Sequence, residues 1–154
     1  MRHPIKSREQ KLDAFFARAK GTDDEELKSD LARFGAVLVC GYVERCVEVV
    51  ILDRLTRMAQ PRVLQFIKSH FKKGRNYDCE AICQPLNRFD QKWEAPFRLT
   101  ISKNDQWSQS LESAYNLRNS IAHGGDGNKG LLGIETFYTD CKSIVAALVE
   151  ATKN

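Results

Sequence analysis

The chain has 154 residues, of which 42% are hydrophobic and 29% are charged, and its net charge is +4 at neutral pH. This length and balance fit one domain built around a single core, and a second domain is not expected. The longest apolar run, from Phe34 to Val43, is about half as long as a membrane-spanning helix must be, which argues against a membrane protein.

The compartment and cofactor expectations rest on the N-terminus and on the cysteines. No basic segment followed by an apolar one, typical of a secretion signal, begins the chain. Five cysteines are an odd number without a paired framework. We therefore expect a cytoplasmic protein without disulfides. Cys79, Cys83 and His70 lack a fourth partner at zinc-site spacing, so no metal and no cofactor is expected.

The first two predicted helices cover Ile5 to Lys20 and Asp24 to Ala59. Gly21 ends the first helix, and the polar residues that follow it can cap the second. Between Ala36 and Leu52 the second helix is apolar on nearly every side. This pattern is typical of a helix at the centre of a bundle.

Three charged residues interrupt that apolar segment: Glu44, Arg45 and Glu48. Unpaired charges are costly in a protein interior. The three residues therefore form an internal ion-pair network, or they line a polar cleft or subunit interface beside the Arg-His helix described below. The sequence leaves both readings open.

Helices are also predicted from Pro61 to Lys73 and from Asp78 to Phe89, with Gly74 between them. The segment from Gln91 to Ile101 has mixed apolar spacing around Pro96. It is therefore either irregular or a short helix.

The segment from Pro61 to Asn76 carries five cations and no acidic residue: Arg62, Lys68, Lys72, Lys73 and Arg75. Such a cluster attracts phosphates, which makes the last four of them candidate RNA-binding residues. A basic run is also typical of a solvated helix face. The sequence does not decide between the two interpretations.

The next helix begins between Ser102 and Asp105 and ends in the run Arg118-Asn119-Ser120-Ile121-Ala122-His123, which Gly124-Gly125 follows. The glycines suit a left-handed helix cap, which places His123 at the helix C-terminus. Arg118 projects from the middle of the helix's apolar stripe, so it needs a carboxylate, a phosphate or a water-filled cleft to face. Asn119 and His123 are four residues apart, close enough for the amide to hydrogen-bond the imidazole.

After a glycine-rich loop from Gly124 to Gly133, a last helix is predicted from Ile134 to Ala151. We therefore expect an all-α fold, an up-and-down helical bundle with additional short helices. Residues 1–154 should form a single domain, with an N-terminal helical extension at 1–20 and a bundle core at 24–151.

The spacing Arg118-Asn119-x3-His123, its place before a loop and a last helix, and Tyr42-Val43-Glu44 in the long helix resemble the HEPN superfamily, in particular its RiboL-PSP-HEPN branch. The resemblance covers about Asp24 to Ala151. It implies a metal-independent endoribonuclease, used as a toxin, in antiviral defence or in RNA processing, with its active cleft across a homodimer interface. Arg118, Asn119 and His123 match the catalytic positions, whereas Glu44 corresponds only by its place in the central helix.

The chemistry of these residue types agrees with that implication. When RNA is cleaved by its own 2′-hydroxyl, a proton leaves the 2′-oxygen, another reaches the 5′-oxygen, and charge gathers on the phosphorus. An imidazole titrates near neutrality and can carry either proton. A guanidinium can neutralise the phosphate oxygens. One chain offers one such histidine, whereas a two-fold dimer would bring two to a single cleft.

Two other functions remain open from the sequence. The chain could be a noncatalytic HEPN module that binds RNA or a protein partner, or a purely structural bundle subunit. The expected partners are an RNA substrate, a second copy of the chain, and a cognate antitoxin or regulatory protein; no membrane is expected.

Overall fold

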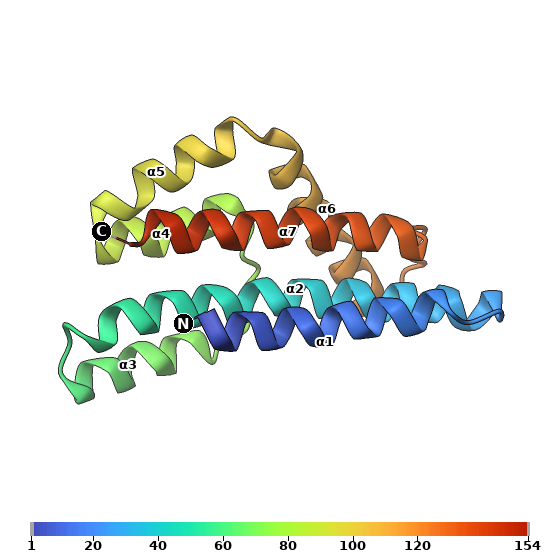
Figure 1. Ribbon diagram of the computed structural model, residues 1–154, viewed down its shortest axis with the longest axis horizontal. Helices are drawn as coiled ribbons and strands as arrows, with labels where there is room; N and C mark the ends of the chain where they lie inside the picture. Colours follow the sequence, from blue (N-terminus) through green and yellow to red (C-terminus); the bar gives the residue numbers. More distant parts are fainter. Residues whose placement is uncertain (1, 154) are drawn as a thin grey trace.

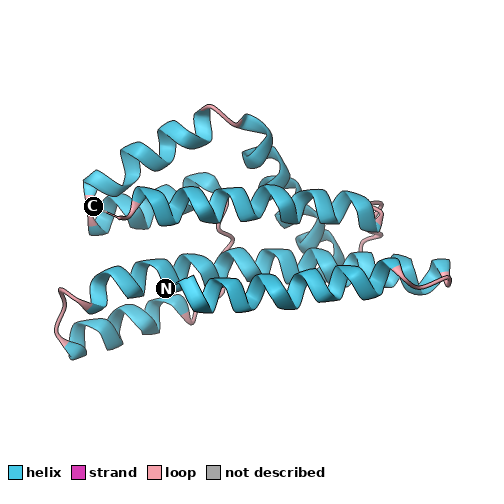
Figure 2. Cartoon of the chain, viewed as in Figure 1, coloured by secondary structure: helices cyan, strands magenta, loops and turns pink. Residues whose placement is uncertain are grey.

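The computed structural model describes residues 2–153, and within them the chain forms seven helices and no strand (Figure 1, Figure 2). The helices are α1 (Arg2–Lys20), α2 (Glu25–Thr56), α3 (Pro61–Phe71), α4 (Cys79–Phe89), α5 (Gln91–Ser102), α6 (Asp105–Ala122) and α7 (Leu131–Ala151). The all-α expectation is confirmed. None of these helices combines the length and the apolar character that crossing a membrane requires.

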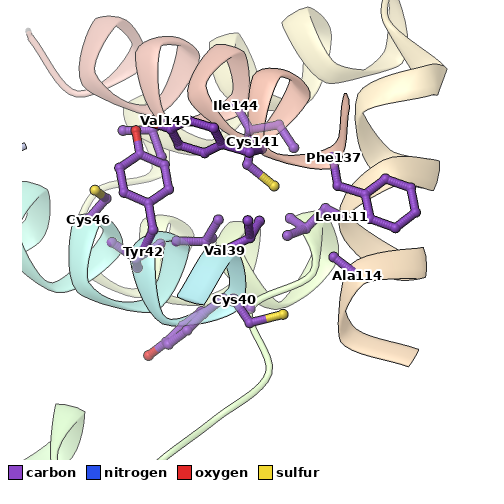
Figure 3. Packing of buried hydrophobic residues seen from close by; sticks show 14 of the residues in the cluster. Val39, Cys40, Tyr42, Cys46, Leu111, Ala114, Phe137, Cys141, Ile144 and Val145 are labelled. Atoms are coloured by element: carbon purple, nitrogen blue, oxygen red, sulfur yellow. The ribbon is translucent and has the colours of Figure 1, made fainter. Parts of the chain in front are cut away.

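Helix α2 is the centre of the bundle, as its apolar pattern predicts. It runs unbroken from Glu25 to Thr56 and packs against α1, α3, α6 and α7. Val39, Val43 and Val47 are fully buried along it. Figure 3 shows how side chains from α2, α6 and α7 fill the space between these helices. The long helices α2 and α7 run in the same direction, whereas α3 and α5, which lie between them in the chain, run in the opposite direction (Figure 1).

Helix α1 contributes to the same core. Its aromatic residues Phe15 and Phe16 are buried against α2. Gly35 of α2 permits this close approach, because a Cβ atom there would lie 3.2 Å from the ring of Phe15. The Tyr138 hydroxyl of α7 donates a hydrogen bond of 3.0 Å to Asp13. Residues 2–20 are therefore packed into the bundle.

The segment around Pro96 is the short helix α5, which settles the choice left open by its sequence. Trp93, Phe97 and Ile101 recur at helical spacing and are all buried. Asp90 caps the first turn by accepting a hydrogen bond from the Lys92 amide at 2.9 Å. Burial of three large side chains thus outweighs the single backbone hydrogen bond that a proline removes.

Helix α7 begins at Leu131, three residues before the predicted start. Leu131 and Ile134 are both buried, so the first turn is stabilised by packing although it contains Gly133. The glycine-rich loop is correspondingly shorter than expected.

Candidate active site

The end of α6 has the geometry that its two glycines predict. Gly124 has φ +77°, the left-handed region, and His123 is the C-cap residue. The Gly124 amide donates to the Ile121 carbonyl at 3.1 Å, and the Gly125 amide donates to the Ser120 carbonyl at 2.8 Å. This pair of bonds is a Schellman motif, which ends the helix sharply and fixes where His123 leaves it.

Two packing contacts set the position of α6 in the bundle. Leu111 and Ala114 are fully buried against the core. Ser110 donates a hydrogen bond of 2.6 Å to Asp140 of α7, and both of these polar residues are buried. The helix is thus anchored on α7, and its face bearing Arg118 is turned toward α2.

Arg118 has a carboxylate, an amide and an aromatic ring around it. Its Nη2 atom lies 3.6 Å from Glu44 Oε1 and donates a hydrogen bond to Asn76 Oδ1. The guanidinium carbon lies 5.4 Å from the centre of the Tyr115 ring, within cation–π range. The predicted need for a charged partner is met by Glu44.

The guanidinium is nevertheless incompletely satisfied. The Arg118 side chain remains 28% exposed. Its Nε atom is buried and has no hydrogen-bond partner among residues 2–153. A guanidinium has five N–H donors, and the contacts with Asn76 and Glu44 engage only those on Nη2. Because part of the side chain is exposed, an anion from solvent can approach the guanidinium, although it cannot reach the buried Nε atom.

Burial raises the pKa of Glu44 above its ordinary value, and the nearby guanidinium groups of Arg118 and Arg45 only partly oppose this effect. The carboxyl group is therefore held in a place that disfavours its charge. Such a carboxyl group binds Arg118 weakly. A phosphate could therefore displace it from the guanidinium.

The sequence leaves two roles open for the charges of α2, an ion-pair network or a lining beside the Arg-His helix, and the structure shows features of both. Arg45 forms an ion pair of 2.7 Å with Glu48, and the Arg45 side chain is 62% exposed. Glu44, by contrast, faces α6. The three residues therefore include both a local ion pair and a partner for the Arg-His helix.

His123 and Asn119 do not form the contact expected from their spacing. No side-chain hydrogen bond joins them in the described part of the chain. Instead, the Asn119 carbonyl oxygen accepts the His123 backbone amide at 3.1 Å. The His123 side chain is exposed at the helix end, and Asn119 is half-buried.

The basic segment lies on α3 and on the connection that follows it. Lys68, Lys72 and Lys73 are exposed and make no ion pair within residues 2–153, whereas Arg75 donates a hydrogen bond of 2.9 Å to Gln84. The connection leads directly to Asn76, which contacts Arg118. The basic segment and the Arg118 site are thus joined through one residue.

Asn76 and Tyr115 are two contacts of Arg118 that sequence reasoning missed. Asn76 is 42 positions away in the chain, in a segment without secondary structure, so no spacing pattern indicates it. Tyr115 is a buried residue of the apolar stripe of α6. Its position three residues before Arg118 on the same helix was the available signal for a ring beside the guanidinium.

Burial raises the pKa of the Cys40 thiol to about 12. The nearby charges of Arg118 and Glu44 have smaller and opposite effects on this pKa. A protonated thiol is a poor nucleophile. No group of three or more side chains that could bind a metal ion is found in the described residues. The chemistry of this region is therefore that of a guanidinium, a carboxyl group, amides and an imidazole.

The family model described as RiboL-PSP-HEPN matches residues 4–154 of the chain. The match therefore includes most of α1 and all of the helices that follow it. Neither the curated proteins nor the solved structures give a significant match.

Proposed function

Because the chain belongs to the RiboL-PSP-HEPN family, we propose that it is a metal-independent endoribonuclease with Arg118, Asn119 and His123 as its catalytic residues. The observation that carries the proposal is the incompletely satisfied Arg118 guanidinium, five residues before an exposed His123 at the end of the same helix.

In the proposed reaction the RNA 2′-oxygen attacks the adjacent phosphorus. A base removes the 2′-hydroxyl proton, the P–O5′ bond breaks, and an acid protonates the leaving 5′-oxygen. The products are a 2′,3′-cyclic phosphate and a 5′-hydroxyl. His123 performs one of the two proton transfers, and Arg118 stabilises the negative charge on the phosphate oxygens in the transition state.

Glu44 and Asn76 act as positioning residues, because both contact Arg118 rather than the phosphate. Asn119 orients the His123 ring once substrate is bound. Arg45 and Glu48 form an ion pair next to Glu44 on α2 and support its position.

We further propose that the active enzyme is a homodimer. One chain offers one exposed imidazole at the end of the helix that carries Arg118, whereas the reaction needs an acid and a base. A two-fold axis close to α6 would place His123 of a second copy across the same cleft.

Uncontrolled RNA cleavage harms the cell that makes such an enzyme. We therefore extend the proposal to a toxin or defence effector that an antitoxin or regulatory protein holds inactive.

A second candidate function is that of a noncatalytic module that binds RNA or a protein partner. It is favoured by the contacts that already occupy Arg118 Nη2, and by the absence of a hydrogen bond between Asn119 and His123 side chains within residues 2–153. In that case the exposed cations would bind phosphates without cleavage.

The decisive experiment is to incubate the purified protein with total RNA in EDTA and to analyse the cut ends. We expect cleavage that leaves 2′,3′-cyclic phosphates. His123→Ala should lower kcat by about 10² to 10⁴, and Arg118→Ala by about 10² to 10³. Arg118→Lys should restore little, because an ammonium group cannot bind two phosphate oxygens in the same way.

Matched controls are His3→Ala and Arg57→Ala, which remove an exposed imidazole and an exposed guanidinium elsewhere. Circular dichroism establishes that each variant is folded. Activity that EDTA abolishes and Mg²⁺ restores would overturn the mechanism. Folded Arg118→Ala and His123→Ala proteins that cleave at the wild-type rate would overturn the assignment of residues. RNA binding without any cleavage would establish the second candidate.

A further inference from the structure

An apolar pocket of about 190 Å³ lies between α3 and α4. Four aromatic side chains contribute to its lining: Phe66, Phe71, Tyr77 and Phe89. It forms because α3 packs chiefly against α2, and only one residue of α3, Ile67, is buried. Phe66 therefore remains 73% exposed and Phe89 remains 37% exposed, although both line the pocket.

The charged residues that line the pocket are Arg75 and Arg88. His70 also lines it, and no acidic residue does. Arg88 makes no ion pair in the part of the chain that the structure describes. The sequence has no acidic residue between Arg54 and Tyr77. Carboxyl groups approach from α2 instead: burial is the main cause of the raised pKa of Tyr77, and the charges of Glu44 and Glu48 add to it. An anionic ligand with a flat apolar part complements this combination.

The pocket adjoins the Arg118 site through three consecutive residues. Arg75 and Tyr77 line the pocket, and Asn76 between them accepts the hydrogen bond from Arg118. Neighbouring Cα atoms are about 3.8 Å apart. A ligand held in the pocket is therefore within a few ångströms of the chain segment that contacts the guanidinium.

The size of the pocket limits what it can hold. Sites for whole drug-sized ligands are usually about 300–1,000 Å³, so a cavity of about 190 Å³ accommodates one planar ring system. Aromatic side chains beside cations are the usual means of binding single-stranded nucleic acid, because every base has a π face that can stack.

We propose that this pocket receives one unstacked base of a single-stranded RNA, while Arg75 and Arg88 bind its phosphates and an adjoining phosphate reaches Arg118. The proposal rests on the proposed function for the choice of RNA as ligand. It adds a base-binding subsite that determines which phosphate lies at Arg118, and it gives the basic segment after α3 a path to the active site.

The test uses a hexanucleotide in which one base is fluorescent 2-aminopurine and the others are uracil. All riboses carry 2′-O-methyl groups, so the proposed reaction cannot destroy the probe. Binding to the wild-type protein should quench the 2-aminopurine emission, because the base stacks on the aromatic side chains. Phe66→Ala and Phe89→Ala should each raise Kd by about 5- to 150-fold, the range expected for loss of one base–aromatic contact. The emission of the saturated complex should also recover.

Leu99→Ala is the matched control, since it also removes a large exposed apolar side chain from a helix, and Leu99 lies on α5 outside the pocket. It should change neither Kd nor emission. Phe66 is exposed enough that its replacement should not unfold the chain. Unchanged Kd and emission in both pocket variants would overturn the proposal. So would a change of oligomeric state in Phe66→Ala with RNA binding intact, because the pocket would then be a protein contact.

Failure here is distinguishable from failure of the proposed function. Quenching that the pocket variants relieve, in a protein that cleaves no RNA, supports the subsite and removes only the nuclease activity. Cleavage whose KM and kcat are both unaffected by Phe66→Ala and Phe89→Ala leaves the nuclease standing and overturns the subsite.

Discussion

The pairing of Glu44 with Arg118 is intermediate between a surface ion pair and a buried one. The side chains are 26% and 28% exposed, and the closest approach of 3.6 Å is too long for a strong hydrogen bond. Exposed pairs of this kind contribute little to stability, and buried pairs can cost more in lost hydration than they gain in attraction. Burial is the largest influence on the pKa of Glu44 and raises it. For this carboxyl group, the lost hydration of its charged form therefore outweighs the attraction to Arg118.

This balance predicts an effect of pH on the Glu44→Gln variant. The pKa of Glu44 in the folded protein lies above its ordinary value of 4.5, so the folded state holds this proton more tightly than the unfolded state does. Wild-type stability is therefore lost as the pH rises from about 4.5 through the raised pKa. The glutamine variant lacks that loss. As the pH rises from about 4 to 7, the wild-type protein should therefore become less stable relative to Glu44→Gln.

Urea unfolding at several pH values measures this difference. Glu112→Gln, which removes an exposed carboxyl group from α6, is the control for the general effect of one less negative charge. A wild-type protein that gains stability over Glu44→Gln as the pH rises would show that attraction to Arg118 outweighs the cost of burial.

At the scale of the helix, the end of α6 shows how a local sequence signal fixes part of a site. Two glycines after His123 predict the left-handed cap, and Gly124 adopts φ +77°. The cap determines the direction in which the chain leaves α6 and hence the exposure of His123. The conformation depends on the glycine, because other L-residues in this region cost about 1–2 kcal/mol.

Gly124→Ala should therefore lower the free energy of unfolding by about 1 kcal/mol and reduce the RNA cleavage rate by shifting His123. Gly41→Ala is the opposite control. Gly41 is inside α2, and a Cβ atom there would meet nothing within 4 Å, so the change should stabilise the helix by about 0.5–1 kcal/mol. Thermal or urea unfolding of both variants checks the pair. A Gly124→Ala protein as stable and active as the wild type would remove the cap from the mechanism.

The helices themselves were largely predictable, because periodicity and capping signals are local. The exceptions have physical causes: tertiary burial holds α5 together around Pro96, and buried Leu131 extends α7 through Gly133. The site was less accessible to sequence reasoning. Arg118 could be recognised as a charge that needed a partner, but Asn76 reaches it only through the folding of a segment without secondary structure. The aromatic pocket could not be predicted from the sequence either, because it depends on how loosely α3 packs against the bundle.

At the scale of the whole molecule, one stripe of α2 is left uncovered beside the site. Phe34 is 53% exposed and Val37 is 40% exposed, although both belong to the central helix. Val37, Gly41 and Glu44 follow one another at helical spacing along this stripe. The loop after α6 lies close by, since a Cβ atom on Gly127 would be 3.5 Å from the side chain of Arg33. A second copy packed on this stripe would lie next to both Glu44 and the end of α6.

Gly41→Arg tests this arrangement of the proposed dimer. A Cβ atom at position 41 would meet nothing within 4 Å in the monomer, and arginine favours a helix more than glycine does by about 0.8 kcal/mol, so folding should not suffer. Across a close helix–helix contact, however, a long cation would prevent packing. We expect light scattering at micromolar concentration to give the mass of two chains for the wild type and of one chain for Gly41→Arg.

The functional consequence follows from the number of imidazoles in the cleft. If each cleft needs His123 from both copies, Gly41→Arg should lose kcat about as severely as His123→Ala does, roughly 10²-fold or more, although every proposed catalytic residue is still present. Ala95→Arg, which places the same side chain at an exposed position of α5, should remain dimeric and active. A wild-type protein that is monomeric while it cleaves RNA would require that one chain supplies both proton transfers. The second group would then have to be sought among the titratable side chains around Arg118, beginning with Glu44, whose raised pKa already suits a carboxyl group that exchanges protons closer to neutral pH.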